Sequence, residues 1–495
     1  MTATETIEAR PDLANPHHDR RWLILALLGT AQLMVVLDAT VVNIALPSAQ
    51  RALRFSDANR QWIVTAYSLT FGSLLLLFGR FGDLFGRKRT LVIGLVGFGV
   101  ISAIGGAAQS FGVLVTARAF QGAAGALLAP SALSLLTTTF TEPRERGIAF
   151  GIYGAIAGAG GAVGLLLGGV LTEYLSWRWC LYVNVVIAVP AVFAALALLT
   201  NQVPSERPRF DIPGAVAVSL GLFLIVFGFS QAEPRGWTDV ETLGSLIVGV
   251  ILLAVFVVIE RRAAHPLLPL RIVLDRNRGG SYLSVLISGA GLFGVFLFLT
   301  YYLQQTLRYS PVTTGLAFLP MVAMIIVGST TSNALLLPRF GPKPLVPTGM
   351  LLAALGMVIL AQLGVNSTYA GHILPALLVI GLGLGLIFAP AINTATLGVS
   401  QADAGVASAT VNSCQQVGGS IGTAFLNTIA TTAVTSYLAG KALTPLLAAR
   451  AAVHGYTVAF WWAAGIFVFG AIVAGTLLRP GAAMALAEAQ PAVAA

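Results

Sequence analysis

Charged residues are scarce in this sequence. Asp, Glu, Lys and Arg make up only 9% of its 495 residues, whereas an average soluble domain has about 25%. Apolar residues make up 57%, and the mean hydropathy is +0.86. A water-soluble particle of this length could not hide so many uncharged residues beneath a polar surface. The composition therefore excludes a soluble protein and indicates a chain that crosses a membrane many times.

Cysteine is nearly absent as well. Cys180 and Cys414 stand in apolar surroundings without metal-ligand spacing, so we expect neither a disulfide nor a metal site. The sequence also lacks an ATP-binding loop and a nucleophile with a matching base, which argues against a primary pump and against an enzyme. We expect no cofactor.

The net charge of +9 could suggest a nucleic-acid partner. Basic residues, however, collect on the cytoplasmic loops of any multi-span protein, and no compact basic domain with interleaved aromatic residues is present. Residues 1–20 are polar, and the apolar run after them is too long for a signal peptide. We therefore expect no nucleic acid and interpret this run as the first span.

Fourteen apolar segments are long enough to cross a bilayer as helices, which takes about 20 residues each. They comprise residues 22–47, 61–79, 90–110, 113–137, 148–171, 179–199, 212–232, 243–259, 280–303, 313–337, 345–365, 372–396, 406–436 and 456–478. An even number places both termini on one side. Most of the 28 Lys and Arg residues fall on that side, so both termini should face the cytoplasm from the plasma membrane.

Two parts of the sequence resemble each other. Short matches recur in the same order about 254 to 260 residues apart: 54–56 with 308–310, 80–92 with 339–346, 125–130 with 385–390, and 160–164 with 418–422. This offset equals eight spans, so both copies have the same orientation. We predict an all-α membrane protein of two six-helix bundles plus two inserted helices, with substrate near mid-membrane between the bundles.

The predicted boundaries follow from this repeat. They are a cytoplasmic tail at 1–21, an N-terminal bundle at 22–200, a linker with two extra spans at 201–278, a C-terminal bundle at 279–479 and a cytoplasmic tail at 480–495. The stretch 260–278 mixes apolar and basic residues. It fits a segment lying along the lipid headgroups and a simple linker equally well.

Only two charges, Asp38 and Arg118, fall well within a predicted span. Each costs about 2.5–3.5 kcal/mol at a helix centre, so neither should persist without a partner or a role. Asp38 lies nine residues before Pro47, about 13 Å from the outer surface, and Arg118 lies about 9 Å deep, six residues after Gly112. The two side chains could therefore meet.

The second copy of the repeat lacks this pair. The counterpart of Arg118 is near Leu378, and that of Asp38 falls in residues 292–298, which hold no acid. Burial and a neighbouring arginine act in opposite directions on the pKa of a carboxyl, and arginine itself stays charged. Movement of Arg118 could therefore load and unload a proton at Asp38. The alternative is a static ion pair that orients two spans.

Two glycine-rich motifs accompany the pair. The loop at 79–89 could latch the cytoplasmic ends of the halves together; its residues are Gly79, Arg80, Gly82, Asp83, Gly86, Arg87, Lys88 and Arg89. The segment 151–169 offers a small-residue face, either for generic helix packing or for movement against the other half. Its candidate residues are Gly154, Gly158, Gly161, Gly164, Gly168 and Gly169.

These motifs resemble those of the major facilitator superfamily, specifically its fourteen-span drug:proton antiporter branch. The resemblance covers about residues 20–480. It rests on the loop at 79–89, on 37–47 in the first span, on 118–122 in the fourth, on 158–169 in the fifth, and on 177–184 and 211–214. The resemblance implies that Arg118 takes part in proton coupling. One departure is Leu165, where the family's antiporter motif has proline.

The resemblance also bears on the substrate. Relatives that export divalent cations look to carry extra acids in later spans, and the second half here has none well inside a span. We therefore expect neutral or monocationic lipophilic substrates. Candidate cavity residues, each of which could instead serve interhelical packing, are Gln32, Asn43, Tyr67, Phe293, Tyr301, Gln304, Asn393, Asn412 and Gln415.

The sequence thus predicts a proton-coupled exporter of lipophilic or antibiotic-like molecules that works by alternating access. Its expected partners are the small-molecule substrate, protons and membrane lipid, and we expect a monomer. Two alternatives remain: an uptake symporter of the same fold, and a membrane scaffold or sensor that transports nothing.

Overall fold

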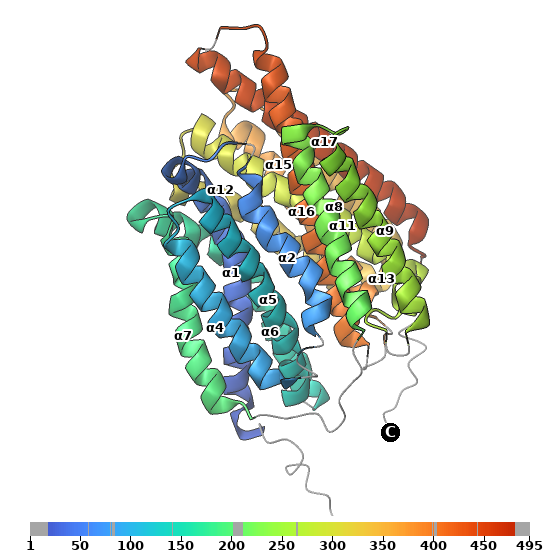
Figure 1. The fold of residues 1–495 in the computed structure, drawn as a ribbon. Helices are drawn as coiled ribbons and strands as arrows, with labels where there is room; N and C mark the ends of the chain where they lie inside the picture. The colour runs from blue at the N-terminus through green and yellow to red at the C-terminus, as the bar shows by residue number, and fades with distance from the viewer. Residues whose placement is uncertain are drawn as a thin grey trace, which may run out of the picture.

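The computed structural model describes residues 18–57, 59–79, 81, 85–140, 142–200, 211–263, 266–397, 399, 403–442 and 444–480, and the regular structure in these ranges is helical throughout. Fourteen long helices form the bundle (Figure 1): α1 (Arg21–Leu53), α2 (Gln61–Gly79), α4 (Arg87–Gly106), α5 (Phe111–Thr139), α6 (Pro143–Val170), α7 (Trp179–Leu198), α8 (Ile212–Arg235), α9 (Val240–Arg262), α11 (Arg276–Tyr301), α12 (Pro311–Thr331), α14 (Pro342–Leu360), α15 (Leu374–Thr396), α16 (Ala404–Leu438) and α17 (Pro445–Leu477). Each overlaps one predicted span.

Shorter elements join or extend these helices. Two are single-turn helices, α10 (Leu270–Val273) and α13 (Leu337–Phe340), and π-helical turns lie at Leu171–Leu175, Tyr302–Thr306, Ser332–Leu336 and Tyr369–Ile373. Among the described residues, eleven helices, some counted with an adjoining turn, are long and apolar enough by length and composition to cross a membrane.

Both ends of the helical region lie at the same end of the bundle, which we call the termini end. Arg21, the first residue of α1, pairs with Glu145 at the beginning of α6 at 2.8 Å. Arg276, the first residue of α11, donates to the carbonyl of Leu477, the last residue of α17, at 3.0 Å. At the opposite end, α16 and α17 form a hairpin that projects beyond the other helices (Figure 1, orange to red).

Helix packing repeats between the two halves. In the first half, α1 packs on α6 and α7, α2 on α5, and α4 on α5 and α7; in the second, α11 packs on α16 and α17, α12 on α15, and α14 on α15 and α17. Matched glycines also face matched helices. A side chain at Gly125 would collide with Phe71 of α2, and one at Gly385 with the backbone of α12 at Ile325. The predicted architecture of two six-helix bundles plus two inserted helices is confirmed.

One predicted span bound needs correction. The span predicted at 22–47 extends beyond Pro47, because α1 continues through it to Leu53; a proline is tolerated there inside a long membrane helix. The stretch after α9 packs against α8 and α9 in its described part, and its place relative to the headgroups stays a prediction. Leu267 and Leu268 are buried, and their backbone amides donate to the Glu260 carboxylate at 3.1 and 3.2 Å.

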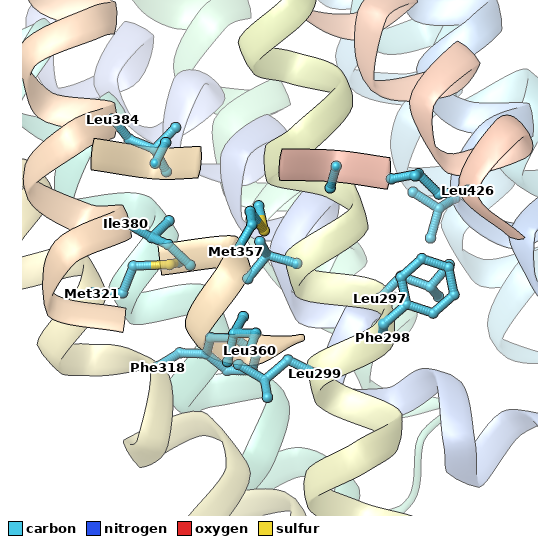
Figure 2. Close-up of a cluster of buried hydrophobic side chains, with 14 of the residues drawn as sticks. Leu297, Phe298, Leu299, Phe318, Met321, Met357, Leu360, Ile380, Leu384 and Leu426 are labelled. Carbon is cyan, nitrogen blue, oxygen red and sulfur yellow. The ribbon is translucent and has the colours of Figure 1, made fainter. Parts of the chain in front are cut away.

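The core of the second half is apolar. Side chains from α11, α12, α14, α15 and α16 interdigitate around its centre (Figure 2), among them Leu297, Phe298, Leu299, Phe318, Met321, Met357, Leu360, Ile380, Leu384 and Leu426. This cluster occupies the part of the repeat where the first half holds its buried charges. Dispersion contacts and small-residue packing therefore hold this half together.

The inserted helices lie across one seam between the halves. α8 packs on α9, and it also contacts α2 of the first half and α16 of the second. The Ser219 hydroxyl of α8 donates to the carbonyl of Ser73 in α2 at 2.9 Å, and Phe229 of α8 lies edge-on to Phe425 of α16 with ring centroids 6.3 Å apart. α8 thus covers the α2–α16 seam with apolar and hydrogen-bonded contacts, and α9 packs on α8.

The halves meet closely at the opposite end. Gly315 of α12 lies against the backbone of Leu165 in α6, so closely that no side chain would fit. The amide of Val312 donates to the Glu173 carboxylate at 2.9 Å. Such close helix approach, reinforced by polar contacts, is how membrane helices associate firmly.

Arg60 also joins the two halves at this opposite end, and we call its contacts the Arg60 clasp. It precedes α2 in the first half, is only 4% exposed, and donates through Nε to Asn427 of α16 at 3.1 Å. Its guanidinium carbon lies 4.4 Å from the ring centroid of Tyr301 and 5.8 Å from that of Tyr456. A desolvated cation over aromatic rings contributes about 2 kcal/mol. Arg60 therefore ties the first half to α11, α16 and α17 of the second.

The Arg60 clasp predicts that removing this side chain makes the central residues accessible from the opposite end. We expect Arg60→Ala to loosen the opposite end and expose the centre of the molecule. In a background with Cys180 and Cys414 replaced by serine, a cysteine introduced by Asn43→Cys should react severalfold faster with an impermeant thiol reagent applied to that face. Arg51→Ala removes an exposed cation at the same end and should leave the rate unchanged. Equal rates in the Arg60 and Arg51 variants would contradict this role.

The close packing around Gly122 predicts that a larger residue at this position destabilises the protein. A Cβ atom there would collide with the Thr70 hydroxyl and the Tyr67 carbonyl of α2, and overpacking of this kind costs about 1–3 kcal/mol. Gly122→Val should therefore lower the melting temperature of the detergent-purified protein by several degrees. Gly112→Val on the same helix has no atom within 4 Å of the new Cβ and should melt like wild type. If both variants melt alike, the α2–α5 contact is less constrained than the structure indicates.

Candidate functional site

A buried ion pair lies inside the first half. Asp38 on α1 and Arg118 on α5 are 0% and 1% exposed, and Arg118 Nη1 lies 2.5 Å from Asp38 Oδ2. α1 and α5 pack against each other and bring the two residues to one level, as their depths in the sequence suggested. The role of this pair in proton coupling stays a prediction.

Two amide side chains, those of Asn184 and Gln121, also donate hydrogen bonds to Asp38. Its Oδ1 accepts from Asn184 Nδ2 of α7 at 2.7 Å and from Gln121 Nε2 of α5 at 3.2 Å. The Gln121 amide also donates to the Ser102 hydroxyl of α4 at 2.7 Å. A buried charge that lacks its partners is strongly destabilising. Asp38 therefore depends on two other helices, α5 and α7, for its hydrogen bonds, and α4 holds one of the donors in place.

Arg118 is held on several sides. Its Nε donates to the carbonyl of Ile63 in α2 at 3.1 Å, and its Nη1 also donates to Gln121 Oε1 at 2.9 Å. The ring of Tyr67, also from α2, lies over the guanidinium with its centroid 4.3 Å from the arginine Cζ. This places Arg118 in a cation–π contact in addition to its charge pair.

A central cavity of about 320 Å³ lies between the halves. It is lined from both bundles by Gln32, Val35, Val36, Ala39, Thr40, Asn43, Tyr67, Phe71, Leu75, Ala129, Pro130, Leu133, Tyr153, Leu292, Phe293, Phe296, Ala409, Asn412, Gln415 and Gln416. The lining from α5 and α16 comes from the halves of those helices nearer the termini end. Amides, two tyrosines and three phenylalanines supply polar and aromatic contacts, and none of these residues carries a formal charge.

Six of the nine predicted cavity residues line this cavity: Gln32, Asn43, Tyr67, Phe293, Asn412 and Gln415. The structure places the other three elsewhere. Tyr301 is fully buried at the opposite end, where its hydroxyl donates to Gln50 at 2.5 Å, and Gln304 donates to the Ile44 carbonyl at 3.0 Å. These two residues seal the halves together beyond the cavity. Asn393 lies on an exposed face of α15.

Several site residues were missed by the sequence reasoning. Tyr153 donates to Gln32 Oε1 at 2.8 Å and lines the cavity, and its signal was its place as a lone polar aromatic residue in the glycine-rich stretch. Gln416 also lines the cavity, one residue beyond the predicted Gln415. The role of Arg60 between the halves gave no signal, because its partners in the second half lie some 240 to 400 residues further along the chain.

The basic loop is described only in part, since Arg80, Gly82 and Asp83 lie outside the described residues. Gly86 has φ 91° where α4 begins, a conformation that favours glycine. Lys88 donates to the carbonyls of Leu196 and Leu199 at 2.9 and 2.5 Å, at the end of α7 in the same half. Lysine there satisfies carbonyls that a helix end leaves free. The latch role stays a prediction for the whole loop.

The candidate antiporter glycines face different surfaces. Gly164 and Gly168 lie against Thr40 and Val41 of α1, whereas Gly169 lies against Pro311 of α12 in the other half. Gly161 has open space beside it, and Gly154 and Gly158 lie in α6 with side-chain surroundings that are not described. This helix therefore packs on its own half along most of its described part and touches the other half near its end.

Comparison with known proteins agrees with this architecture. The family model of the Major Facilitator Superfamily matches residues 28–423. A puromycin resistance protein of Streptomyces alboniger is 51% identical over 461 residues, covering 93% of this chain and 92% of that protein. A cephamycin export protein of Amycolatopsis lactamdurans is 41% identical over 410 residues, covering 82% and 84%.

A solved structure shares the fold. The bacterial homologue of the human lysosomal transporter Spinster, in an inward-facing and occupied conformation, matches with a TM-score of 0.64 at 16% identity, over 92% of this chain and 96% of that one. A family match of this length, a repeated six-helix packing and a cavity between the two repeats all agree. This chain belongs to the major facilitator superfamily and is a multi-pass membrane transporter rather than an enzyme.

Proposed function

We propose that this transporter exports lipophilic neutral or monocationic antibiotic-like molecules across the plasma membrane in exchange for protons. The observation that carries the proposal is the buried Asp38–Arg118 pair beside an uncharged cavity between the two halves. The resistance and export proteins to which this chain is similar support the direction of transport and the class of substrate. Puromycin is accordingly the first compound to test.

The arrangement of the halves supports alternating access from the termini end. Basic residues accumulate at that end, as on the cytoplasmic side of membrane proteins. The contacts of Gly315, Arg60 and Tyr301 close the opposite end, so the cavity in this state would load from the cytoplasm or the inner leaflet. The loop at 79–89 would then close the cytoplasmic end in the other state.

Exchange of substrate for a proton fits the chemistry of the pair. An arginine guanidinium does not give up its proton in proteins, so the proton that the proposal requires is carried by Asp38. A change in the Arg118–Asp38 distance alters the affinity of Asp38 for that proton. A proton moving inward releases about 2.3 kcal/mol per 100 mV of membrane potential, enough to sustain a neutral-substrate gradient on the order of 40-fold.

The cavity supports a substrate of drug size. Ligand pockets of roughly 300–1,000 Å³ with apolar walls and a few polar groups bind such molecules, and this cavity falls at the lower end of that range. Cavity and ion pair are complete within one chain, which supports a working monomer. The lipid around the bundle would then serve as a solvent through which lipophilic substrates approach.

The coupling assignment can be tested with inverted membrane vesicles. We expect wild-type protein to accumulate puromycin or a lipophilic dye when a pH gradient is imposed, and Asp38→Asn and Arg118→Ala to lose at least nine-tenths of that gradient-driven uptake, an estimate based on leaving a buried partner uncompensated. Glu241→Gln removes an exposed carboxylate at the opposite end and is the matched control. Equal gradient-driven uptake in all four proteins would exclude the assignment.

The uncharged cavity predicts discrimination by substrate charge. Monocationic dyes should be exported, whereas dicationic analogues of the same aromatic core should be poor substrates, because none of the described lining residues is a carboxylate that could offset a second charge. Gln415→Glu should add transport of the dication. Gln362→Glu places the same charge at an exposed position outside the cavity and should not. Good dication export by wild type would show that the cavity tolerates an uncompensated charge.

A further inference from the structure

Tyr67 is the side chain that joins the cavity to the ion pair. It lies on α2, is 1% exposed, and belongs to the lining of the cavity. Its ring also covers the guanidinium of Arg118, with 4.3 Å between the ring centroid and Cζ. Asp38 itself is not among the lining residues, so a substrate in the cavity reaches the charge pair through this ring.

The Tyr67 hydroxyl has no hydrogen-bond partner within the part of the chain that the structure describes. Buried tyrosine hydroxyls usually have one, since leaving a buried polar group unpaired costs free energy. The Oε1 atom of Gln416, on α16 where it packs against Gly72 of α2, is likewise buried and unpaired within the described residues. The first group can donate a hydrogen bond, and the second can only accept one. Both atoms belong to residues that line the same cavity.

We propose that Tyr67 binds the substrate through its hydroxyl and transmits occupancy of the cavity to the Asp38–Arg118 pair through its ring. This proposal rests on the proton-coupled export proposed above. The matching substrate carries a hydrogen-bond acceptor for Tyr67 and a donor for Gln416 on an aromatic body that packs against Phe71 and Phe293. Such a molecule would contact α2 of the first half and α16 of the second at once.

The transmission step follows from what surrounds the pair. The titratable or charged groups that face Asp38 are Arg118 from α5, Tyr67 from α2 and Cys180 from α7. When a substrate in the cavity packs against the Tyr67 ring, the ring shifts over Arg118 and the guanidinium moves relative to the carboxylate. Substrate binding and proton binding at Asp38 are then linked, and the linkage is reciprocal.

Two substitutions separate the roles of the hydroxyl and the ring. Tyr67→Phe removes only the hydroxyl, so the Kd for puromycin should rise about tenfold, the equivalent of one hydrogen bond, while its pH dependence keeps the wild-type midpoint. Tyr67→Leu removes the ring from Arg118, so the pH midpoint should shift and fewer protons should be released per puromycin bound. Both quantities can be measured on purified full-length protein, with a pH indicator in weak buffer.

Phe71→Leu is the matched control for loss of a ring. Phe71 lines the cavity and stacks on Tyr67 with ring centroids 5.8 Å apart. Its loss should weaken puromycin binding without moving the pH midpoint. Tyr67→Met serves as a second ring-free variant should the leucine protein fail to fold, with size-exclusion chromatography as the check.

The possible outcomes are distinct. An unchanged Kd in Tyr67→Phe excludes the hydroxyl as a substrate contact, and an unchanged pH midpoint in the ring-free variants excludes the transmission step; either result overturns the proposal. A wild-type protein that binds puromycin with no pH dependence and no proton release instead contradicts proton coupling itself. Failure of wild type to bind puromycin at all counts against the proposed substrate class.

Discussion

A charge buried among membrane-spanning helices has to be satisfied by protein groups, because lipid offers none. Asp38 meets this requirement with a guanidinium and two amides contributed by α5 and α7, and Arg118 with the carboxylate, a backbone carbonyl and a tyrosine ring. The requirement fixes how α1, α2, α5 and α7 pack in the first half. It also explains why a small displacement of any of these helices changes the environment of the pair.

Much of this site could be predicted from the sequence. Two isolated charges in apolar spans at similar depth, absent from the second copy of the repeat, identify Asp38 and Arg118 without any structure. Gln121 and Asn184 belong to recognisable motifs, but their contact with Asp38 depends on the rotation of α5 and α7 about their axes. Hydropathy locates a span but does not determine the rotation of its helix about the helix axis, because a membrane helix has almost no polar face to orient it.

The wrong predictions of cavity residues have a related cause. Tyr301, Gln304 and Asn393 are polar or aromatic residues in spans of the second half, as are Phe293, Asn412 and Gln415, which do line the cavity. Whether such a residue faces the cavity, the other half or the exterior depends on helix rotation and on which end of the bundle is closed. Here the opposite end is closed, so Tyr301 and Gln304 belong to the seal. Arg60 belongs to the same seal, and only the tertiary fold brings it to Asn427.

The two halves share a packing pattern but divide their tasks. The second half fills its centre with apolar side chains (Figure 2), whereas the first half places a hydrogen-bonded charge pair in the equivalent region. α2 connects these tasks, since Arg60 before it clasps the second half and Tyr67 within it covers Arg118 and lines the cavity. Arg60 and Tyr67 are seven residues apart, which is close to two helical turns. A shift of α2 along or about its axis therefore acts on both residues together. Under the proposed proton coupling, opening of one end has to follow a change at the Asp38–Arg118 pair, and α2 has the contacts to link the two.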